Sequence, residues 1–316
     1  MSLQRFILKR TLLVIPIMFG VSVITFALVY LTPGDPVDVI AAGNPNMGAG
    51  EQARLRAEMG LDRPIHVQYW DWISGALQGD FGDSYRTNRP VSALIQRRLP
   101  ETVALGLFGW AIGLIIAIPT GVYAAVRKGS LGDDVSRFVA LFGISIPNFW
   151  LGVMLITIFA SSLGLWPILS PREPLWHPDM LYYLILPGLT IGTASSAVLM
   201  RIMRSSMVEE MNKEYVTAAR AKGLPERTVV VKHVLRNSLI SVVTVAAFLT
   251  ANIFAGSIVV EVVFAWPGLG REFYQAILQR EVNTIMAITL LTGVVIVIMN
   301  FLADIVYALL DPRIRY

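Results

Sequence analysis

Six long apolar runs without charged residues constrain this chain more than any other feature of its sequence. Each run has at least 21 residues, and about 20 mostly apolar residues can cross a bilayer as a helix. Only 15% of the residues are charged, against about 25% in soluble domains, so the chain lacks the polar surface that water requires. We therefore expect six membrane spans, at residues 11–34, 102–126, 138–171, 180–200, 237–260 and 282–303.

The ends of these runs add two local expectations. The first run follows Arg5, Lys9 and Arg10, as in a signal peptide, but it lacks a small-x-small cleavage site, so we expect an uncleaved anchor. The third run is long enough to include an extracytoplasmic loop. Proline inside a helix removes a backbone hydrogen bond and promotes a kink. Such prolines are Pro16, Pro119, Pro147 and Pro187.

The distribution of basic residues predicts the orientation. Six spans place both ends of the chain on one side, and cytoplasmic segments are enriched in Lys and Arg. With cytoplasmic ends, the inner segments hold 16 Lys and Arg in 63 residues, and the outer segments hold 10 in 111 residues. We therefore expect cytoplasmic termini. The inner segments are then 1–10, 127–137, 201–236 and 311–316, and the outer ones are 32–100, 162–180 and 262–284.

The chemistry of soluble enzymes finds no support in the sequence. Neither the phosphate-binding string Gly-x4-Gly-Lys-Ser/Thr nor the zinc motif His-Glu-x-x-His occurs, and Gly-x-Ser-x-Gly is also missing. The three histidines are scattered, and the chain has no cysteine. We expect no catalytic residue, no bound metal and no cofactor on this chain. The basic residues flank apolar runs, which indicates a membrane rather than a nucleic acid as the partner.

Polar residues within the apolar runs have two possible roles. They can line a wet path through the membrane, or they can join helices through hydrogen bonds, and the sequence favours neither role. Glu261 and Asp304 lie near the ends of spans, where a paired structural charge is the simpler explanation. The candidates for a translocation path are Ser145, Asn148, Ser195, Ser196, Asn252, Ser257 and Glu261.

The inner loop 204–236 has a pattern typical of protein docking. Between Met207 and Lys222, similar side chains repeat every three to four residues, as on one face of a helix. Gly223 followed by Pro225 predicts a helix stop and a restart. The small residues Ala218 and Ala219 would allow close approach of another protein. An amphipathic helix lying on the membrane is the alternative, but the polar face also carries glutamates.

The string from Glu214 to Leu224, followed by His-Val-Leu-Arg-Asn at 233–237, resembles the EAA loop of binding-protein-dependent ABC importer permeases. It is most similar to the dipeptide, oligopeptide and nickel branch. The general pattern is Glu-Ala-Ala, three residues and Gly, and Thr217, Ala218, Ala219 and Gly223 occupy these places here. Thr217 therefore replaces the glutamate, as is usual in the peptide branch.

Several other segments resemble the B-type permease of this branch. Together they cover nearly the whole chain in the family's order. They are Arg-Phe-Ile-Leu-Lys-Arg at 5–10, Thr-Pro-Gly-Asp-Pro at 32–36, Leu-Asp-Arg-Pro at 61–64, Gly-Asp-Phe-Gly at 79–82, Trp-Pro-Gly-Leu-Gly at 266–270 and Asp-Pro-Arg-Ile-Arg-Tyr at 311–316.

The resemblance implies an all-α membrane protein with the six-helix fold of type I ABC importer permeases. It divides the chain into residues 1–31 (tail and first span), a periplasmic segment 32–100, a transmembrane core 101–310 and a cytoplasmic tail 311–316. It further implies a bacterial inner membrane location, a C-type partner permease, two ATPase subunits that hold ATP and Mg²⁺, and a periplasmic solute-binding protein. The residues implied in ATPase coupling are Glu214, Tyr215, Thr217, Ala218, Ala219, Arg220, Lys222, Gly223 and Leu224.

The expected solute is a dipeptide or oligopeptide, with nickel, glutathione or an opine as alternatives from the same branch. A proton-coupled secondary transporter and a membrane scaffold without transport are the alternatives from other classes. The outer loop at 264–271 combines a stiff proline with two glycines and one large aromatic. We expect either a contact with the binding protein or an interfacial tryptophan anchor there. The contact candidates are Trp266, Pro267, Gly268 and Leu269.

Overall fold

The computed structural model describes residues 3–31, 36–43, 47–167, 177 and 179–310. Within these residues the regular elements are helices, with one isolated bridge between Asp83 and Pro90. The outer motif at 32–35 and the tail at 311–316 lie outside the described residues. The helices are α1 (Leu3–Tyr30), α2 (Pro36–Gly43), α3 (Ala49–Glu58), α4 (Ile65–Leu77), α5 (Val91–Val126), α6 (Leu131–Ser145), α7 (Asn148–Leu155), η1 (Ile156–Ser162), α8 (Met180–Met211), α9 (Glu214–Ala221), α10 (Glu226–Thr228), η2 (Val229–Leu235), α11 (Arg236–Val263), α12 (Leu269–Leu278) and α13 (Val282–Leu310).

Five helices in the described part are long and apolar enough to cross a membrane, and a bent pair brings the number to six if it counts as one span. The pair consists of α6 followed by α7 and η1, and it takes the place of the third span expected at 138–171, in which only a kink at Pro147 was expected. The helix axis changes direction by 103° between the two parts. Ile146 has extended backbone angles because the following Pro147 disfavours the helical conformation. The other three prolines lie inside uninterrupted helices.

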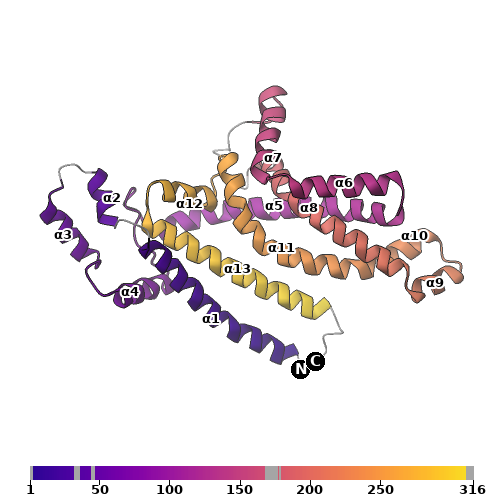
Figure 1. Cartoon of the computed structure of the whole chain (residues 1–316), viewed down its shortest axis with the longest axis horizontal. Helices are drawn as coiled ribbons and strands as arrows, with labels where there is room; N and C mark the ends of the chain where they lie inside the picture. The colour runs from indigo at the N-terminus through magenta and orange to yellow at the C-terminus, as the bar shows by residue number, and fades with distance from the viewer. Residues whose placement is uncertain (1–2, 32–35, 44–46, 168–176, 178, 311–316) are drawn as a thin grey trace.

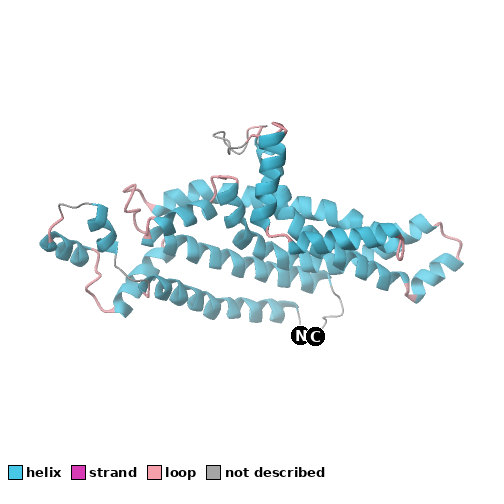
Figure 2. Ribbon diagram, turned by 45° about the horizontal axis from the view of Figure 1, so that its top comes forward, coloured by secondary structure: helices cyan, strands magenta, loops and turns pink. Residues whose placement is uncertain are grey.

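The central contact of the fold joins α5 to α8 at backbone distance. A Cβ atom on Gly109 would lie 2.8 Å from the Cβ atom of Ile191, and one on Gly192 would lie 2.8 Å from the carbonyl oxygen of Gly109. Small residues permit this approach in a membrane, where packing rather than water exclusion holds helices together. Figures 1 and 2 show the long helices running along one direction, with α7 turned away from them.

The connections that the basic residues assign to the cytoplasm lie at one end of the molecule. The α9–α10 connection, the first turns of α1 and the last turns of α13 are at this end, while α3, α4 and α12 are at the other (Figure 1). Arg10 on α1 forms an ion pair of 2.8 Å with Asp304 on α13. This pairing accounts for a carboxylate inside the last apolar run.

At the opposite end, α4 packs against the outer part of α1 through aromatic side chains. Tyr69 lies edge-on to Phe26, with ring centroids 5.5 Å apart, and its hydroxyl is 2.8 Å from that of Ser22. Trp72 contacts the same Phe26 ring. These contacts attach the outer segment to the first membrane helix, α1.

Single cysteines test the orientation, because the chain has none of its own. Thr87 and Lys128 are both exposed and lie at opposite ends. We expect Thr87→Cys to react with a membrane-impermeant thiol reagent in intact spheroplasts. Lys128→Cys should react only after the membrane has been permeabilised. The opposite labelling would show that the ends of the chain are outside.

Candidate functional sites

The first candidate site is the corner formed by α9, the turn at 222–225 and α10, which we call the cytoplasmic corner after the side that the basic residues predict for it. Helix α9 ends in a Schellman motif, in which the Leu224 N–H donates to Ala219 O at 3.4 Å and the Gly223 N–H donates to Arg220 O at 2.9 Å. Gly223 has φ = +78°, a left-handed conformation that commonly ends a helix, and the predicted helix stop is found here. Nothing lies within 4 Å of the position that its Cβ atom would occupy.

An ion pair closes the cytoplasmic corner on its outer side. Arg220 donates to both carboxylate oxygens of Glu226, at 2.7 and 3.1 Å, and so joins α9 to α10 across the turn. Both side chains are substantially exposed, so the pair contributes geometry more than stability.

The two faces of α9 have different surroundings. Val216 and Ala219 are buried and pack with Met203, Met207 and Val234 in a core that α5 and α8 also share. Ala219 therefore points into its own chain, in contrast to the expectation that both alanines face a partner. The exposed candidates at this corner are Glu214, Thr217, Ala218, Arg220, Lys222, Gly223 and Leu224.

Tyr215 connects the corner to the neighbouring helices. Its hydroxyl donates to Glu210 at the end of α8 and accepts a hydrogen bond of 3.0 Å from the Asn237 amide at the start of α11. Burial and the adjacent Glu210 carboxylate raise the pKa of Tyr215. The hydroxyl therefore keeps its proton at neutral pH and remains available as a donor.

The second candidate site surrounds Glu261, whose side chain is fully buried near the outer end. Its Oε1 accepts hydrogen bonds from the hydroxyls of Thr102 at 2.9 Å and Ser257 at 3.1 Å. Its Oε2 accepts the Arg271 backbone N–H at 3.1 Å. Both oxygens of the carboxyl group therefore have hydrogen-bond partners within the chain.

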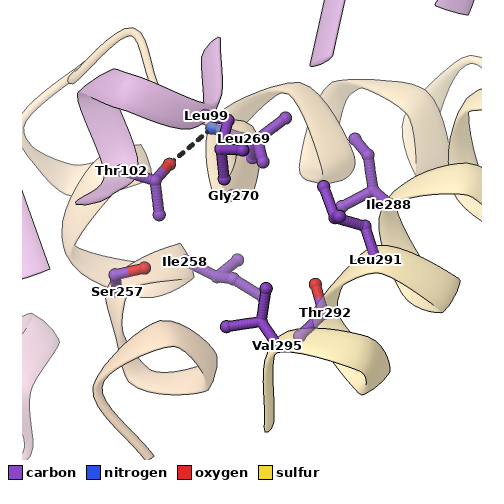
Figure 3. Close-up of a pocket in the computed structure, with 10 residues that line it drawn as sticks. All are labelled: Leu99, Thr102, Ser257, Ile258, Leu269, Gly270, Ile288, Leu291, Thr292 and Val295. Atoms are coloured by element: carbon purple, nitrogen blue, oxygen red, sulfur yellow. Dashed lines mark hydrogen bonds between the residues drawn. The ribbon is translucent and has the colours of Figure 1, made fainter. Parts of the chain in front are cut away.

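Glu261 and Thr102 together satisfy the first backbone N–H groups of α12. The Thr102 hydroxyl accepts from Leu269 N at 2.8 Å while it donates to Glu261, so its proton position is fixed (Figure 3). These N–H groups have no partner inside their own helix. A negative charge is also favourable at this end of a helix because of the helix dipole. The N–H groups and the dipole at the start of α12 thus stabilise the buried carboxyl group of Glu261.

The turn at 264–270 wraps tightly around this carboxylate. A Cβ atom on Gly268 would lie 2.4 Å from Glu261 Oε2, and one on Gly270 would lie 2.6 Å from the Ile258 Cα atom. Only glycine fits either position without displacement. Trp266 is 1% exposed, and its ring N–H donates to Glu101 O at 3.0 Å. Of the four predicted contacts with a binding protein, only Pro267 is partly exposed, and Trp266, Gly268 and Leu269 are buried.

A small cavity lies beside the carboxylate, between α5, α11, α12 and α13 (Figure 3). Its volume is about 30 Å³, which is enough for a water molecule but too small for an amino acid. The hydroxyls of Thr102, Ser257 and Thr292 line it among apolar side chains. The cavity cannot serve as a solute site in this arrangement.

The remaining polar candidates do not join the Glu261 network. Ser145 and Ser196 donate to carbonyl oxygens of their own helices, at Leu141 O and Thr193 O. Asn148 begins α7 directly after the bend, and Ser195 is half-buried on α8. The side chain of Asn252 on α11 lies outside the described residues.

Sequence reasoning missed Thr102, Gly270 and Arg271 as partners of Glu261. One signal was available: a carboxylate at the end of an apolar run needs donors, and the nearby Gly-Leu-Gly string predicts an unusually close turn. Among the described residues no cluster of three or more His, Cys, Asp or Glu side chains is placed to hold a metal ion.

Comparison with known proteins identifies the family. The family described as "Binding-protein-dependent transport system inner membrane component" matches residues 117–316, and its N-terminal counterpart matches residues 3–106. This chain belongs to that family. The spans described above are thus those of a multi-pass inner membrane component.

Two relatives match this inner membrane component along almost its whole length. The oligopeptide transport system permease protein AppB of Bacillus subtilis (strain 168) is 39% identical, with 98% of this chain and 99% of AppB covered. The dipeptide transport system permease protein DppB of Escherichia coli (strain K12) is 37% identical, with 99% of each chain covered.

A solved structure shares the fold of the inner membrane component. The MetNI methionine ABC transporter in an inward-facing conformation matches with a TM-score of 0.57 at 18% identity, over 69% of this chain and 96% of the other. The expected type I ABC importer permease fold is thereby confirmed. Both relatives are named as permease proteins, which is consistent with a transporter subunit rather than an enzyme.

The Glu261 network can be tested by removing one acceptor. In Glu261→Gln the amide NH₂ replaces an oxygen, so at least one of the surrounding donors loses its acceptor. We expect a loss of about 1–3 kcal/mol of stability for each unpaired donor. The melting temperature of the purified inner membrane component in detergent should fall.

The matched control is Glu58→Gln, which breaks an exposed pair of 2.8 Å with Arg54 on α3. An exposed pair of this kind contributes about 0–1 kcal/mol. Equal melting temperatures for the two variants would mean that the Glu261 network does not stabilise the outer end.

Proposed function

We propose that this chain is one of two permease subunits of an ATP-driven importer that takes up dipeptides or oligopeptides. The observation that carries the proposal is the match to peptide permeases over almost the full length of both proteins, at 37–40% identity. The uptake pathway forms between this subunit and a related C-type permease. Within this chain the described cavity is too small for a solute, which is consistent with a pathway that needs both subunits.

The energy comes from partner subunits. The sequence contains no phosphate-binding string, so two separate ATPase subunits hold ATP and Mg²⁺. They bind from the cytoplasm, and a periplasmic solute-binding protein delivers the peptide on the opposite side. The termini are cytoplasmic in this arrangement, in agreement with the excess of Lys and Arg in the inner segments.

The cytoplasmic corner is the contact through which the ATPase subunits act. Its outer face is exposed and has charged and small residues around an unobstructed Gly223. Its inner face is part of the core of α5 and α8 through Val216 and Ala219. When ATP closes the ATPase pair, a push on α9 is therefore passed directly to the membrane helices, and the pathway alternates between its inward-open and outward-open forms.

The outer turn at 264–270 has a structural role in this proposal. Because Trp266 is buried and bonded to the α5 backbone, its side chain supports the turn from inside. Pro267 is partly exposed, whereas the other three candidates in the turn are buried, and we assign to Pro267 the contact with the binding protein.

A proton-coupled transporter is less well supported. A proton relay needs carboxylates that can gain and lose protons inside the membrane. Glu261 is surrounded by donors, and Asp304 is paired with Arg10. Neither is placed to exchange protons. Nickel, glutathione and opines remain the alternative solutes of the same branch, and the binding protein selects among them.

The proposal predicts the result of reconstitution. With the C-type permease, both ATPase subunits and the binding protein in proteoliposomes, a radiolabelled dipeptide should accumulate only when ATP and Mg²⁺ are supplied. A proton gradient alone should give no uptake. Uptake driven by the gradient without ATP would contradict the assignment to an ABC importer.

Substitution of Gly223 tests the ATPase contact. Gly223→Val or Gly223→Asp costs about 1–2 kcal/mol in backbone conformation but meets no atom of this chain. We expect the variants to insert and to pair with the partner permease. The side chain should stand between α9 and the ATPase, so ATPase subunits should be lost on affinity purification, or ATP hydrolysis should no longer drive uptake.

Gly79→Val is the matched control. Gly79 has φ = +81°, no atom lies within 4 Å of its Cβ position, and it lies in the outer segment. It imposes the same backbone cost without touching the corner, so the ATPase subunits should be retained. Retention of the subunits and normal uptake in both Gly223 variants would refute the docking role.

A further inference from the structure

A buried ion pair joins α6 to α8 beside the cytoplasmic corner. Arg204 Nε donates to Asp133 Oδ1 at 2.6 Å, and Arg204 Nη2 donates to Oδ2 at 2.7 Å, so the contact is bidentate. The Asp133 side chain is 1% exposed and that of Arg204 is 18% exposed. Two parallel hydrogen bonds fix both the distance and the relative rotation of the groups they join.

The protein holds this carboxylate in place from its own helix as well. The Gly129 N–H donates to Asp133 Oδ2 at 2.9 Å, and the Ser130 hydroxyl accepts from Asp133 N as the N-cap of α6. The first turn of α6 is thus rigid, with Asp133 presented toward α8. Arg137 approaches the same carboxylate only to 3.7 Å and is itself exposed.

Arg204 lies on the part of α8 that packs against the cytoplasmic corner. Met203 and Met207 flank it, and both are in the core shared with α9 and η2. Helix α6 contributes little apolar contact to this core, since Ala140 is its only member among the partly buried residues around it in the described chain. Much of its remaining surface, including Leu131 and Phe138, is exposed. The ion pair therefore adds a directional link between α6 and the part of α8 that packs against the corner.

Beyond the bend at Pro147, α7 reaches the outer turn. A Cβ atom on Gly152 of α7 would lie 3.0 Å from the Phe264 ring and 3.2 Å from the Val263 side chain. Phe264 belongs to the same packed cluster as Trp266. The bent pair α6–α7 therefore runs from the cytoplasmic corner to the turn around Glu261 (Figure 1).

We propose that Asp133 and Arg204 are positioning residues for transport, which make α6 and α7 follow the cytoplasmic corner so that its motion reaches the outer turn. This inference rests on the proposed function of the corner. An apolar contact alone would let α6 slide or rotate on α8. The bidentate pair instead transmits both shift and rotation, and α7 carries them to the end of α11.

The test compares uptake per ATP hydrolysed in the reconstituted complex. In Asp133→Asn and Arg204→Gln we expect the complex to assemble and to hydrolyse ATP, while the ratio of peptide uptake to ATP hydrolysis falls about fivefold or more, as for the loss of an allosteric coupling. The charge exchange Asp133→Arg with Arg204→Asp should restore part of the ratio. A purely structural pair would change the yield of the complex without changing this ratio.

Asp134→Asn is the matched control. Asp134 is the next residue, is 55% exposed and pairs with Arg137 rather than with α8. It should leave the ratio unchanged. If Asp133→Asn and Arg204→Gln keep the wild-type ratio, or if Asp134→Asn lowers it equally, the inference is wrong.

Arg204→Lys decides the case in which the neutral variants do not assemble. Lysine keeps the charge but cannot form two parallel hydrogen bonds, so we expect assembly with a lowered ratio. A wild-type ratio in Arg204→Lys would overturn the inference. If the proposed function itself were wrong, the wild-type complex would show no ATP-dependent peptide uptake. That result differs from a failure of the inference about Asp133 and Arg204, in which the wild-type complex still transports.

Discussion

The approach of α5 and α8 at backbone distance is the constraint on which the other contacts depend. In a membrane the apolar side chains gain little by leaving lipid, so helices associate where small residues let many atoms touch. Gly109 and Gly121 on α5 face Ile191 and Met203 on α8 with no room for a larger side chain, and Gly113 lies in tight contact with Gly192. Helices α6 and α11 then pack against this pair, α13 packs on α11, and α1 packs on α13 (Figure 1).

Charged groups in this fold are used at the two ends of the helices. Asp133 with Arg204 and Asp304 with Arg10 lie toward the end that the basic residues assign to the cytoplasm, and Glu261 with the first turn of α12 lies toward the opposite end. Between these ends the described helices meet mainly through apolar and small side chains. Such contacts are less directional than hydrogen-bonded pairs. Helices that are held by directional pairs at their ends and by apolar contacts between the ends can tilt as whole units.

The sequence predicted the elements better than the contacts between them. Long apolar runs determine membrane helices because the bilayer fixes their length, and Gly223 predicts its turn because few other residues adopt a left-handed conformation. Ala218 and Ala219 could not both face a partner, because adjacent residues on a helix point about 100° apart. The break at Pro147 was expected only as a kink, since its size depends on what α7 packs against.

The partners of Glu261 were hidden for a different reason. Thr102 lies 159 residues earlier in the chain, and no local pattern places two such residues side by side. Their contact exists only because α5 passes the N-terminus of α12. The sequence can show that an acidic residue lies near the end of a span and needs donors. Which residues supply the donors depends on the tertiary arrangement.

A surface that passes motion from one subunit to another must keep its shape under load. Contacts within this chain hold the shape of the cytoplasmic corner. The Schellman motif closes α9, Arg220 with Glu226 spans the turn, and Tyr215 joins α8 to α11. Each of these contacts lies within the chain and leaves the outer face of α9 exposed. In the proposed importer, an ATPase subunit bound to this face would meet a preformed surface, so little of its binding energy would be spent on ordering the corner. The remaining energy would be available to move α8 and, by the role proposed for Arg204 and Asp133, to move α6.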